Sequence, residues 1–308
     1  MPDPMSVTSS TTANSSASTL AFLALLGAGV AVGFSPNFAR LSDLAPLASG
    51  FYRLALAVPA VWLAITLTGG GLEPLSRMAP RHRWRLIFAG LAFAADIAFW
   101  HLAIAQTTIL EATLLSSTVP IIVSIASVLL FGERLKPLFV LGLVIALAGV
   151  TVLALQKTGA AAAPPNRLVG GIFAFLAASF FALYLLLIAT VRQHSSTGTV
   201  MFYTTLISAL AMLPFALAMS PTLLSGSFNG WLTLLGLAVI SHAGGQGMMT
   251  FALAHLPTSF SSMMGLMQTA VAAIVAWALF SEPLTLMMLA SGATILAGIW
   301  ICRKATAV

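Results

Sequence analysis

Charged side chains are scarce in this sequence: Asp, Glu, Lys and Arg make up 6% of its 308 residues, whereas hydrophobic residues make up 59%. A soluble domain carries about 25% charged residues, because its surface has to be hydrated. The scarcity therefore excludes a water-soluble globular protein and predicts a polytopic membrane protein. The formal net charge of +6 then reflects basic loops that face anionic lipid, and we expect no nucleic-acid partner.

Cysteine and the common catalytic motifs are also nearly absent. Cys302 is the only cysteine, which excludes an intrachain disulfide and a cysteine-based metal site. The sequence contains no His-Glu-x-x-His, no Gly-x-Ser-x-Gly and no Gly-x4-Gly-Lys-[Ser/Thr]. We therefore expect no enzymatic activity, no direct use of ATP, no metal and no cofactor.

Basic residues are missing from the N-terminal stretch 6–19, which consists almost entirely of Ser, Thr, Ala and Asn. A secretory signal peptide needs a basic region before its apolar core, so this stretch does not fit one. We predict a disordered tail over residues 1–19, followed by a helix from Leu20 that stays in the membrane.

Long apolar runs dominate the rest of the chain. A membrane-spanning helix needs about 20 mostly apolar residues. Cutting the sequence at charges, prolines and polar clusters predicts ten spans, over residues 20–38, 46–67, 85–105, 109–131, 136–155, 168–190, 198–219, 230–254, 258–280 and 285–302. The predicted fold class is an all-α integral membrane protein whose short connections make neighbouring helices antiparallel.

The second half of the sequence repeats the first. The recurring segments are Leu130-Phe131-x-Glu133-x-Leu135 with Leu279-Phe280-x-Glu282-x-Leu284, and Leu147-Ala148-Gly149 with Leu296-Ala297-Gly298, at a constant offset of 149 residues. A long, apolar unit of this kind indicates a duplicated membrane bundle. We predict a five-helix repeat over 20–156, a linker over 157–167 and a second five-helix repeat over 168–304. Because five is odd, the second repeat enters the membrane upside down.

Basic residues are unevenly shared between the two sides of this bundle. With the N-terminus inside, nine fall on the inner side and three on the outer side. The inner residues are Arg77, Arg81, Arg83, Arg85, Arg134, Lys136, Arg192, Arg303 and Lys304, and the outer ones are Arg40, Lys157 and Arg167. The positive-inside rule therefore places both termini in the cytoplasm.

The repeated segments, together with Pro120 in the fourth span and Arg53 in the second, resemble the EamA family of the drug/metabolite transporter superfamily. One departure is Thr269, which stands where the second copy could carry the counterpart of Pro120. The resemblance implies a ten-helix carrier in the bacterial inner membrane, usually an exporter of small metabolites. Members include YddG-type exporters of aromatic and other amino acids.

Asp96 lies near the middle of the third predicted span, where an ionisable residue costs about 2.5–3.5 kcal/mol by insertion scales. Phe93, Asp96 and Trp100 share one face of that helix. The corresponding face of the eighth span carries His242, Gly245, Gln246 and Met249. Inverted symmetry places spans three and eight on either side of the central axis, so we expect these faces to line a cavity near the midplane.

Two roles are open for Asp96. In the first, Asp96 and His242 contact the substrate or carry a coupled proton. In the second, Asp96 pairs with Arg53, which lies at a similar depth on the second span. Arg53 either clamps a substrate carboxylate in bidentate fashion or extends toward the interface. His101, near the outer end of the third span, and Tyr184, on the sixth, complete the candidate substrate-binding residues.

Two substrate classes fit these residues. An exporter of aromatic or other neutral amino acids would set Arg53 against the carboxylate and Asp96 against the amine, and we favour this class. The alternative is an exporter of lipophilic cations or drugs that works by proton antiport at Asp96. Either carrier would act in the lipid bilayer as a monomer, since two duplicated halves form a complete pathway in one chain.

Glu133 and its counterpart Glu282 lie in the short turns that follow the fourth and ninth spans. We expect them to be architectural, as caps of the fifth or tenth span.

Overall fold

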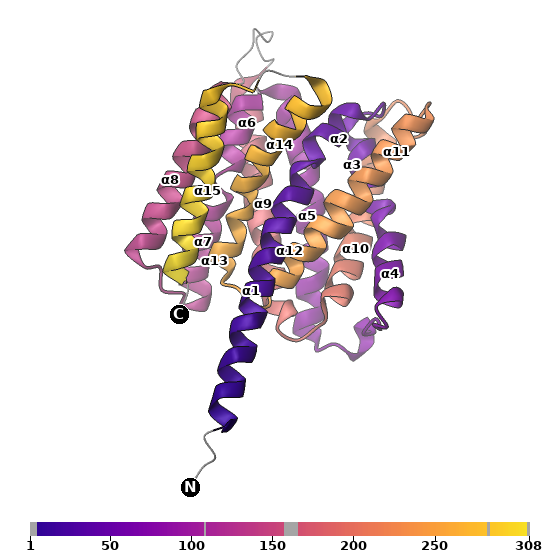
Figure 1. Ribbon diagram of the computed structural model, residues 1–308. Helices are drawn as coiled ribbons and strands as arrows, with labels where there is room; N and C mark the ends of the chain where they lie inside the picture. The colour runs from indigo at the N-terminus through magenta and orange to yellow at the C-terminus, as the bar shows by residue number, and fades with distance from the viewer. Residues whose placement is uncertain (1–4, 108, 157–165, 282–283, 307–308) are drawn as a thin grey trace.

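The computed structural model describes residues 5–107, 109–156, 166–281 and 284–306. Within these ranges the regular elements are helices and none is a strand, which confirms the predicted all-α fold. The helices stand side by side in one bundle, and both ends of the chain lie at the same end of it (Figure 1). We call that end the terminal end and the opposite one the far end.

The helices follow the predicted spans closely. In the first half they are α1 (Met5–Gly33), α2 (Ser35–Leu41), α3 (Pro46–Ala55), α4 (Ala57–Leu67), the short 3-10 helix η1 (Leu75–Arg77), α5 (Pro80–Gln106), α6 (Ile109–Ser116), α7 (Val119–Phe131) and α8 (Pro137–Leu155). In the second half they are α9 (Arg167–Arg192), α10 (Thr197–Met219), α11 (Phe228–Gly236), the π-helix η2 (Leu237–Gln246), α12 (Gly247–Ala252), α13 (Thr258–Ser262), α14 (Met264–Phe280) and α15 (Leu286–Thr306).

Nine helical runs in the described part of the chain are long and apolar enough to cross a membrane. The remaining predicted span, the eighth, is the run α11–η2–α12, which is continuous from Phe228 to Ala252 but π-helical in its middle. The third span begins at Pro80 and not at residue 85. A proline suits the first helical position because its fixed φ matches the helix and it lacks an N–H that would stay unbonded there.

Prolines also explain why several spans consist of two helices. A proline inside a helix clashes with the carbonyl group four residues earlier and removes a hydrogen bond. The second span accordingly breaks after Ala55, four residues before Pro59, and the fourth breaks after Ser116, four residues before Pro120. Each of these two spans is therefore divided into two helices.

The packing of α8 against α15 shows directly that the two repeats are inverted. A Cβ atom on Gly149 would lie 2.9 Å from the carbonyl oxygen of Ser291, and one on Gly298 would lie 2.6 Å from that of Gly142. Position 142 is the repeat counterpart of 291, and 149 is that of 298, so the two contacts are symmetry mates. Because 149 meets 291 while 142 meets 298, these equivalent helices run antiparallel.

The N-terminal segment differs from the sequence prediction. A disordered tail was predicted for residues 1–19, but α1 begins at Met5 and its first turns extend beyond the terminal end of the bundle (Figure 1). Helix propagation is much easier than nucleation, so the apolar part of the span carries the helix into the polar Ser/Thr/Ala stretch that precedes it. Most of the predicted linker, residues 157–165, lies outside the described residues, and the side chain of Asn166 caps the start of α9.

Candidate functional site

Arg53 on α3 lies at the centre of a polar group in the far half of the bundle. One terminal nitrogen of its guanidinium group donates to the Ser35 hydroxyl over 3.1 Å. The ring of His101, on α5, packs against α3 at Gly50, where a Cβ atom would meet Nε2 at 3.2 Å. The Trp100 ring stands edge-on to that of His101, with centroids 5.4 Å apart. Helices α3 and α5 therefore bring together Arg53, Trp100 and His101.

Asp96 belongs to the same group but does not pair with Arg53. The two charges act on each other electrostatically, yet no hydrogen bond or ion pair joins them within the described residues. The Asp96 side chain remains partly exposed in the helix bundle. An ionised carboxylate can accept several hydrogen bonds, but none of the described residues donates one to Asp96. The direct Asp96–Arg53 pair, one of the two roles open for Asp96, is therefore not formed here.

Three buried polar atoms in this group also lack a partner among the described residues: Ser49 Oγ, Arg53 Nε and His101 Nδ1. Leaving a buried polar group unbonded costs about 1–3 kcal/mol. Most native proteins avoid such groups, so each one in a structure calls for an explanation. Polar atoms of this kind, gathered beside an accessible carboxylate, are what a polar ligand would satisfy.

Phe93 connects this group to the second half of the chain. Its ring lies 4.7 Å from that of Tyr184 on α9 and 5.4 Å from that of His242 on η2, measured between centroids. The Asp96-bearing face of α5 therefore does meet the His242-bearing face of η2. The contact is made by aromatic packing and not across an open gap.

His242 and Gln246 are almost fully buried. The Nε2 atom of His242 bonds with the Thr205 hydroxyl over 2.9 Å, while His242 Nδ1 and Gln246 Oε1 have no partner within the described part of the chain. Both residues lie in the π-helical segment, and π-turns often occur at functional sites. Met249, one turn further along, is completely buried.

The eight candidate residues therefore form two groups. Arg53, Asp96, Trp100 and His101 lie together and are partly accessible. Tyr184, His242, Gln246 and Met249 are almost fully buried. The rings of Tyr184 and His242 pack on Phe93, and both residues interact electrostatically with Arg53. The sequence analysis did not single out Ser49, although its position four residues before Arg53 puts both on one face of a helix.

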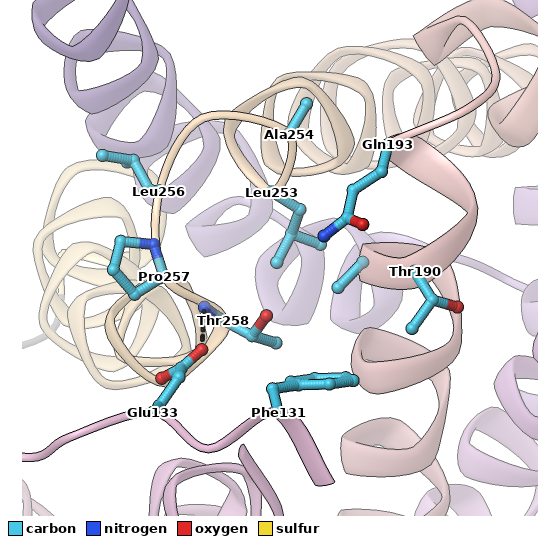
Figure 2. A pocket seen from close by; sticks show the side chains of 10 residues that line it. Phe131, Glu133, Thr190, Gln193, Leu253, Ala254, Leu256, Pro257 and Thr258 are labelled. Carbon is cyan, nitrogen blue, oxygen red and sulfur yellow. Dashed lines mark hydrogen bonds between the residues drawn. The ribbon is translucent and has the colours of Figure 1, made fainter. Parts of the chain in front are cut away.

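The terminal end is closed by a contact between the two repeats. Glu133, in the turn after α7, accepts the backbone N–H of Thr258 at 3.1 Å and the hydroxyl of Ser259 at 2.5 Å. Figure 2 shows this carboxylate beneath the start of α13. The prediction that Glu133 caps the fifth or tenth span is therefore wrong: it caps the ninth. The reason is that Lys136 and Pro137 already begin α8, whereas α13 has no side-chain cap of its own.

A cavity of about 180 Å³ lies beside this contact. Its walls are Phe131, Glu133, Ala189, Thr190, Gln193, Leu253, Ala254, Leu256, Pro257 and Thr258. Gln193, which follows the end of α9, lies on the opposite side of the cavity from Glu133 and Thr258 (Figure 2). The cavity is thus lined by elements of both repeats.

The far end lacks an equivalent closure in the described residues. Helix α13 packs on α7 at the terminal end, but the symmetry-related elements α6 and α14 form no comparable packed pair. Glu282, the repeat counterpart of Glu133, lies outside the described residues. Among the described residues, the fourth and ninth spans are therefore packed together through α7 and α13 at the terminal end, whereas α6 and α14 are not packed together in this way.

The two repeats have a counterpart in a known protein family. The EamA-like transporter family matches residues 19–155 and again residues 168–303. This chain belongs to the EamA-like transporter family. It is accordingly a membrane transporter built from two inverted repeats, as the sequence resemblance implied.

Individual relatives agree with this assignment. An uncharacterized transporter of Archaeoglobus fulgidus is 28% identical over 219 residues, which are 71% of this chain and 74% of that protein. The uncharacterized transporter YetK of Bacillus subtilis is 30% identical over 111 residues, 36% of this chain and 34% of YetK. A solved crystal structure superposes with a TM-score of 0.80 at 17% identity, over 95% of this chain and 98% of the other, which shows the shared fold alone.

Proposed function

We propose that this EamA-family transporter exports neutral amino acids, aromatic or other, across the bacterial inner membrane. The observation that carries the proposal is the pair formed by Asp96 and Arg53. Both charges lie in one partly accessible group, and neither satisfies the other through a direct bond. A zwitterion would complement both, with its amine at Asp96 and its carboxylate at Arg53, where charge-assisted hydrogen bonds are the strongest.

The proposed transport cycle is alternating access between inverted repeats. The excess of basic residues at the terminal end supports a cytoplasmic position for both termini. Closure of that end by Glu133 and α13 then corresponds to an outward-facing state, in which the Asp96–Arg53 group is reached from outside. Opening the terminal end while closing the far end would expose the same group to the cytoplasm.

A second substrate class is favoured by the surroundings of Asp96. The Trp100 aromatic ring lies one turn further along the same face of α5, and an aromatic face attracts a cation. A lipophilic cation exchanged for a proton at Asp96 would use both residues and would not need Arg53. Proton coupling is part of the proposal for either substrate class, and the chain is proposed to work as a monomer.

Counterflow uptake into proteoliposomes distinguishes the two classes. The purified protein is given labelled phenylalanine, threonine and tetraphenylphosphonium in parallel. Amino-acid uptake that is lost in both Asp96→Asn and Arg53→Ala supports the zwitterion carrier. Cation uptake that survives Arg53→Ala and disappears in Asp96→Asn would replace it with a cation exporter.

A further inference from the structure

Ser49 on α3 is one of several buried serines whose hydroxyl has no partner among the described residues, and it is the one that lies a turn from the unbonded Nε of Arg53. Helical Ser and Thr side chains buried in apolar surroundings commonly donate to a carbonyl three or four residues earlier. In this chain Thr204, Ser208 and Ser291 do so over 2.7–2.8 Å. Ser49 is only 2% exposed, yet its hydroxyl bonds to none of the described residues. Its donor capacity is therefore available to something that the chain does not provide.

The surroundings of Ser49 point to an anionic group as that missing partner. Ser49 and Arg53 lie one turn apart on the same face of α3, and His101 packs against Gly50 between them. The unbonded atoms of these three side chains, Ser49 Oγ, Arg53 Nε and His101 Nδ1, are all able to donate. Ser49 also lies near the N-terminus of α3, which has no side-chain cap at Ala45 and carries the positive end of the helix dipole.

We infer that Ser49 is a specificity-determining residue that completes a carboxylate subsite with Arg53 and His101. The inference rests on the proposed amino-acid transport and adds to it a residue and a reason for selectivity. Two carboxylate oxygens offer about four acceptor positions, which match donors from a planar guanidinium, a hydroxyl and an imidazole. Asp96, on the same helix as His101, repels an anion that lacks a positive group. The site therefore selects zwitterions over simple carboxylates.

The test compares two ligands that differ only in the carboxylate. Uptake of labelled phenylalanine is measured in proteoliposomes, and its inhibition by unlabelled phenylalanine is compared with inhibition by phenethylamine. In Ser49→Ala the apparent affinity for phenylalanine should fall about tenfold, the usual effect of removing one hydrogen bond to a charged group. Inhibition by phenethylamine should stay at its wild-type value, because that ligand has no carboxylate for Ser49 to contact.

Two further variants control for indirect effects. Ser179→Ala removes a hydroxyl that is already bonded to the carbonyl of Phe175, and it should leave both affinities unchanged. Ser49→Cys keeps the shape of the side chain with a weaker donor, and its phenylalanine affinity should lie between those of the wild type and Ser49→Ala.

Each remaining outcome has a distinct meaning. Unchanged phenylalanine affinity in Ser49→Ala, or an equal loss for both ligands, would overturn the role of Ser49 and leave amino-acid transport standing. Wild-type protein that takes up tetraphenylphosphonium but neither phenylalanine nor threonine would overturn the proposed function itself, and the carboxylate subsite with it.

Discussion

Two carboxylates in this transporter have opposite surroundings. Glu133, at the terminal end, has both oxygens bonded, one to a backbone N–H and one to a hydroxyl of the other repeat. Asp96, inside the bundle, accepts no bond from the described residues and remains partly accessible. A carboxylate whose bonds are all made within the chain stabilises one arrangement of the helices. A carboxylate without such bonds adds nothing to that arrangement and is available to a ligand or a proton.

The largest effect should come from Asp96→Asn. Replacing the carboxylate by an amide removes the charge that faces the substrate amine, so we expect transport to fall by about a hundredfold, the upper range for one charge-assisted hydrogen bond. The melting temperature should hardly change, because no described residue bonds to Asp96. Initial rates of counterflow and a thermal melt in detergent check both parts. Near wild-type flux in a well-folded mutant would remove Asp96 from the mechanism.

Arg53→Lys should have the next largest effect. Lysine keeps the positive charge but loses the planar set of donors that suits a carboxylate, and it cannot readily reproduce both the bond to Ser35 and the free Nε. We expect the apparent KM for phenylalanine to rise about tenfold with little change in stability. Arg53→Lys kinetics equal to those of the wild type would show that only the charge at this position matters.

Glu133→Gln tests the opposite member of the comparison. The amide still accepts one hydrogen bond but cannot accept from both Thr258 and Ser259, and its loss of charge weakens the cap by about 1 kcal/mol. The closed terminal end should therefore open more often. Ala254→Cys, in the wall of the adjacent cavity, should react several-fold faster with a water-soluble maleimide in the Glu133→Gln background. Cys302 is buried, so background labelling should be low.

Glu282→Gln is the matched control from the other repeat. By inverted symmetry it acts at the far end, so it should not speed the labelling of Ala254→Cys. Faster labelling in both variants would mean that the loss of either charge loosens the whole bundle, and Glu133 would then have no particular role in closing the terminal end.

The architecture could be predicted from the sequence because it depends on local and repeated patterns. Apolar runs bounded by prolines and charges give the spans, and the recurrence of Leu147-Ala148-Gly149 gives the duplication. The packing of Gly149 and Gly298 against the opposite repeat shows why that motif recurs. A glycine is needed wherever two helix backbones approach this closely.

The candidate site could be predicted only in part. Helical periodicity placed Asp96 and Trp100 on one face, and in the structure Asp96 interacts electrostatically with Arg53 while the Trp100 ring contacts that of His101. It could not reveal that the Phe93 ring packs against those of Tyr184 and His242, because ring packing between helices depends on the angles at which the helices cross. The partner of Glu133 was missed for a related reason: Glu133 bonds to residues more than 120 positions away.

Thr205→Val tests whether the second, buried group serves structure or transport. It removes the bond to His242 Nε2 and leaves both ring nitrogens unpaired, since Nδ1 already lacks a partner among the described residues. We expect a loss of about 1–3 kcal/mol in stability, seen as a lower melting temperature, with the KM for phenylalanine within twofold of wild type. A KM shift larger than that of Arg53→Lys would move His242 into the substrate site.

The smallest expected effect concerns a third carboxylate, Asp43, in the exposed loop between α2 and α3. Its Oδ2 atom accepts bonds from Ser225 Oγ at 2.9 Å, the Gly226 N–H at 3.1 Å and Ser227 Oγ at 3.2 Å, which join the two repeats at the far end. These bonds, above all the one from Ser225, hold the pKa of Asp43 below its ordinary value of 3.8. A lowered pKa means that the ionised form is favoured in the folded state. The ionised carboxylate therefore stabilises the fold fully above the unfolded pKa, and this stabilisation is lost as the pH falls through the folded pKa.

Asp43→Asn removes the ionisable group, so the mutant should not lose this small stabilisation in acid. The difference in melting temperature between wild type and mutant should therefore shrink as the pH falls below about 4. A difference that stays constant with pH would show that the loop is held by the shape of the side chain and not by its charge.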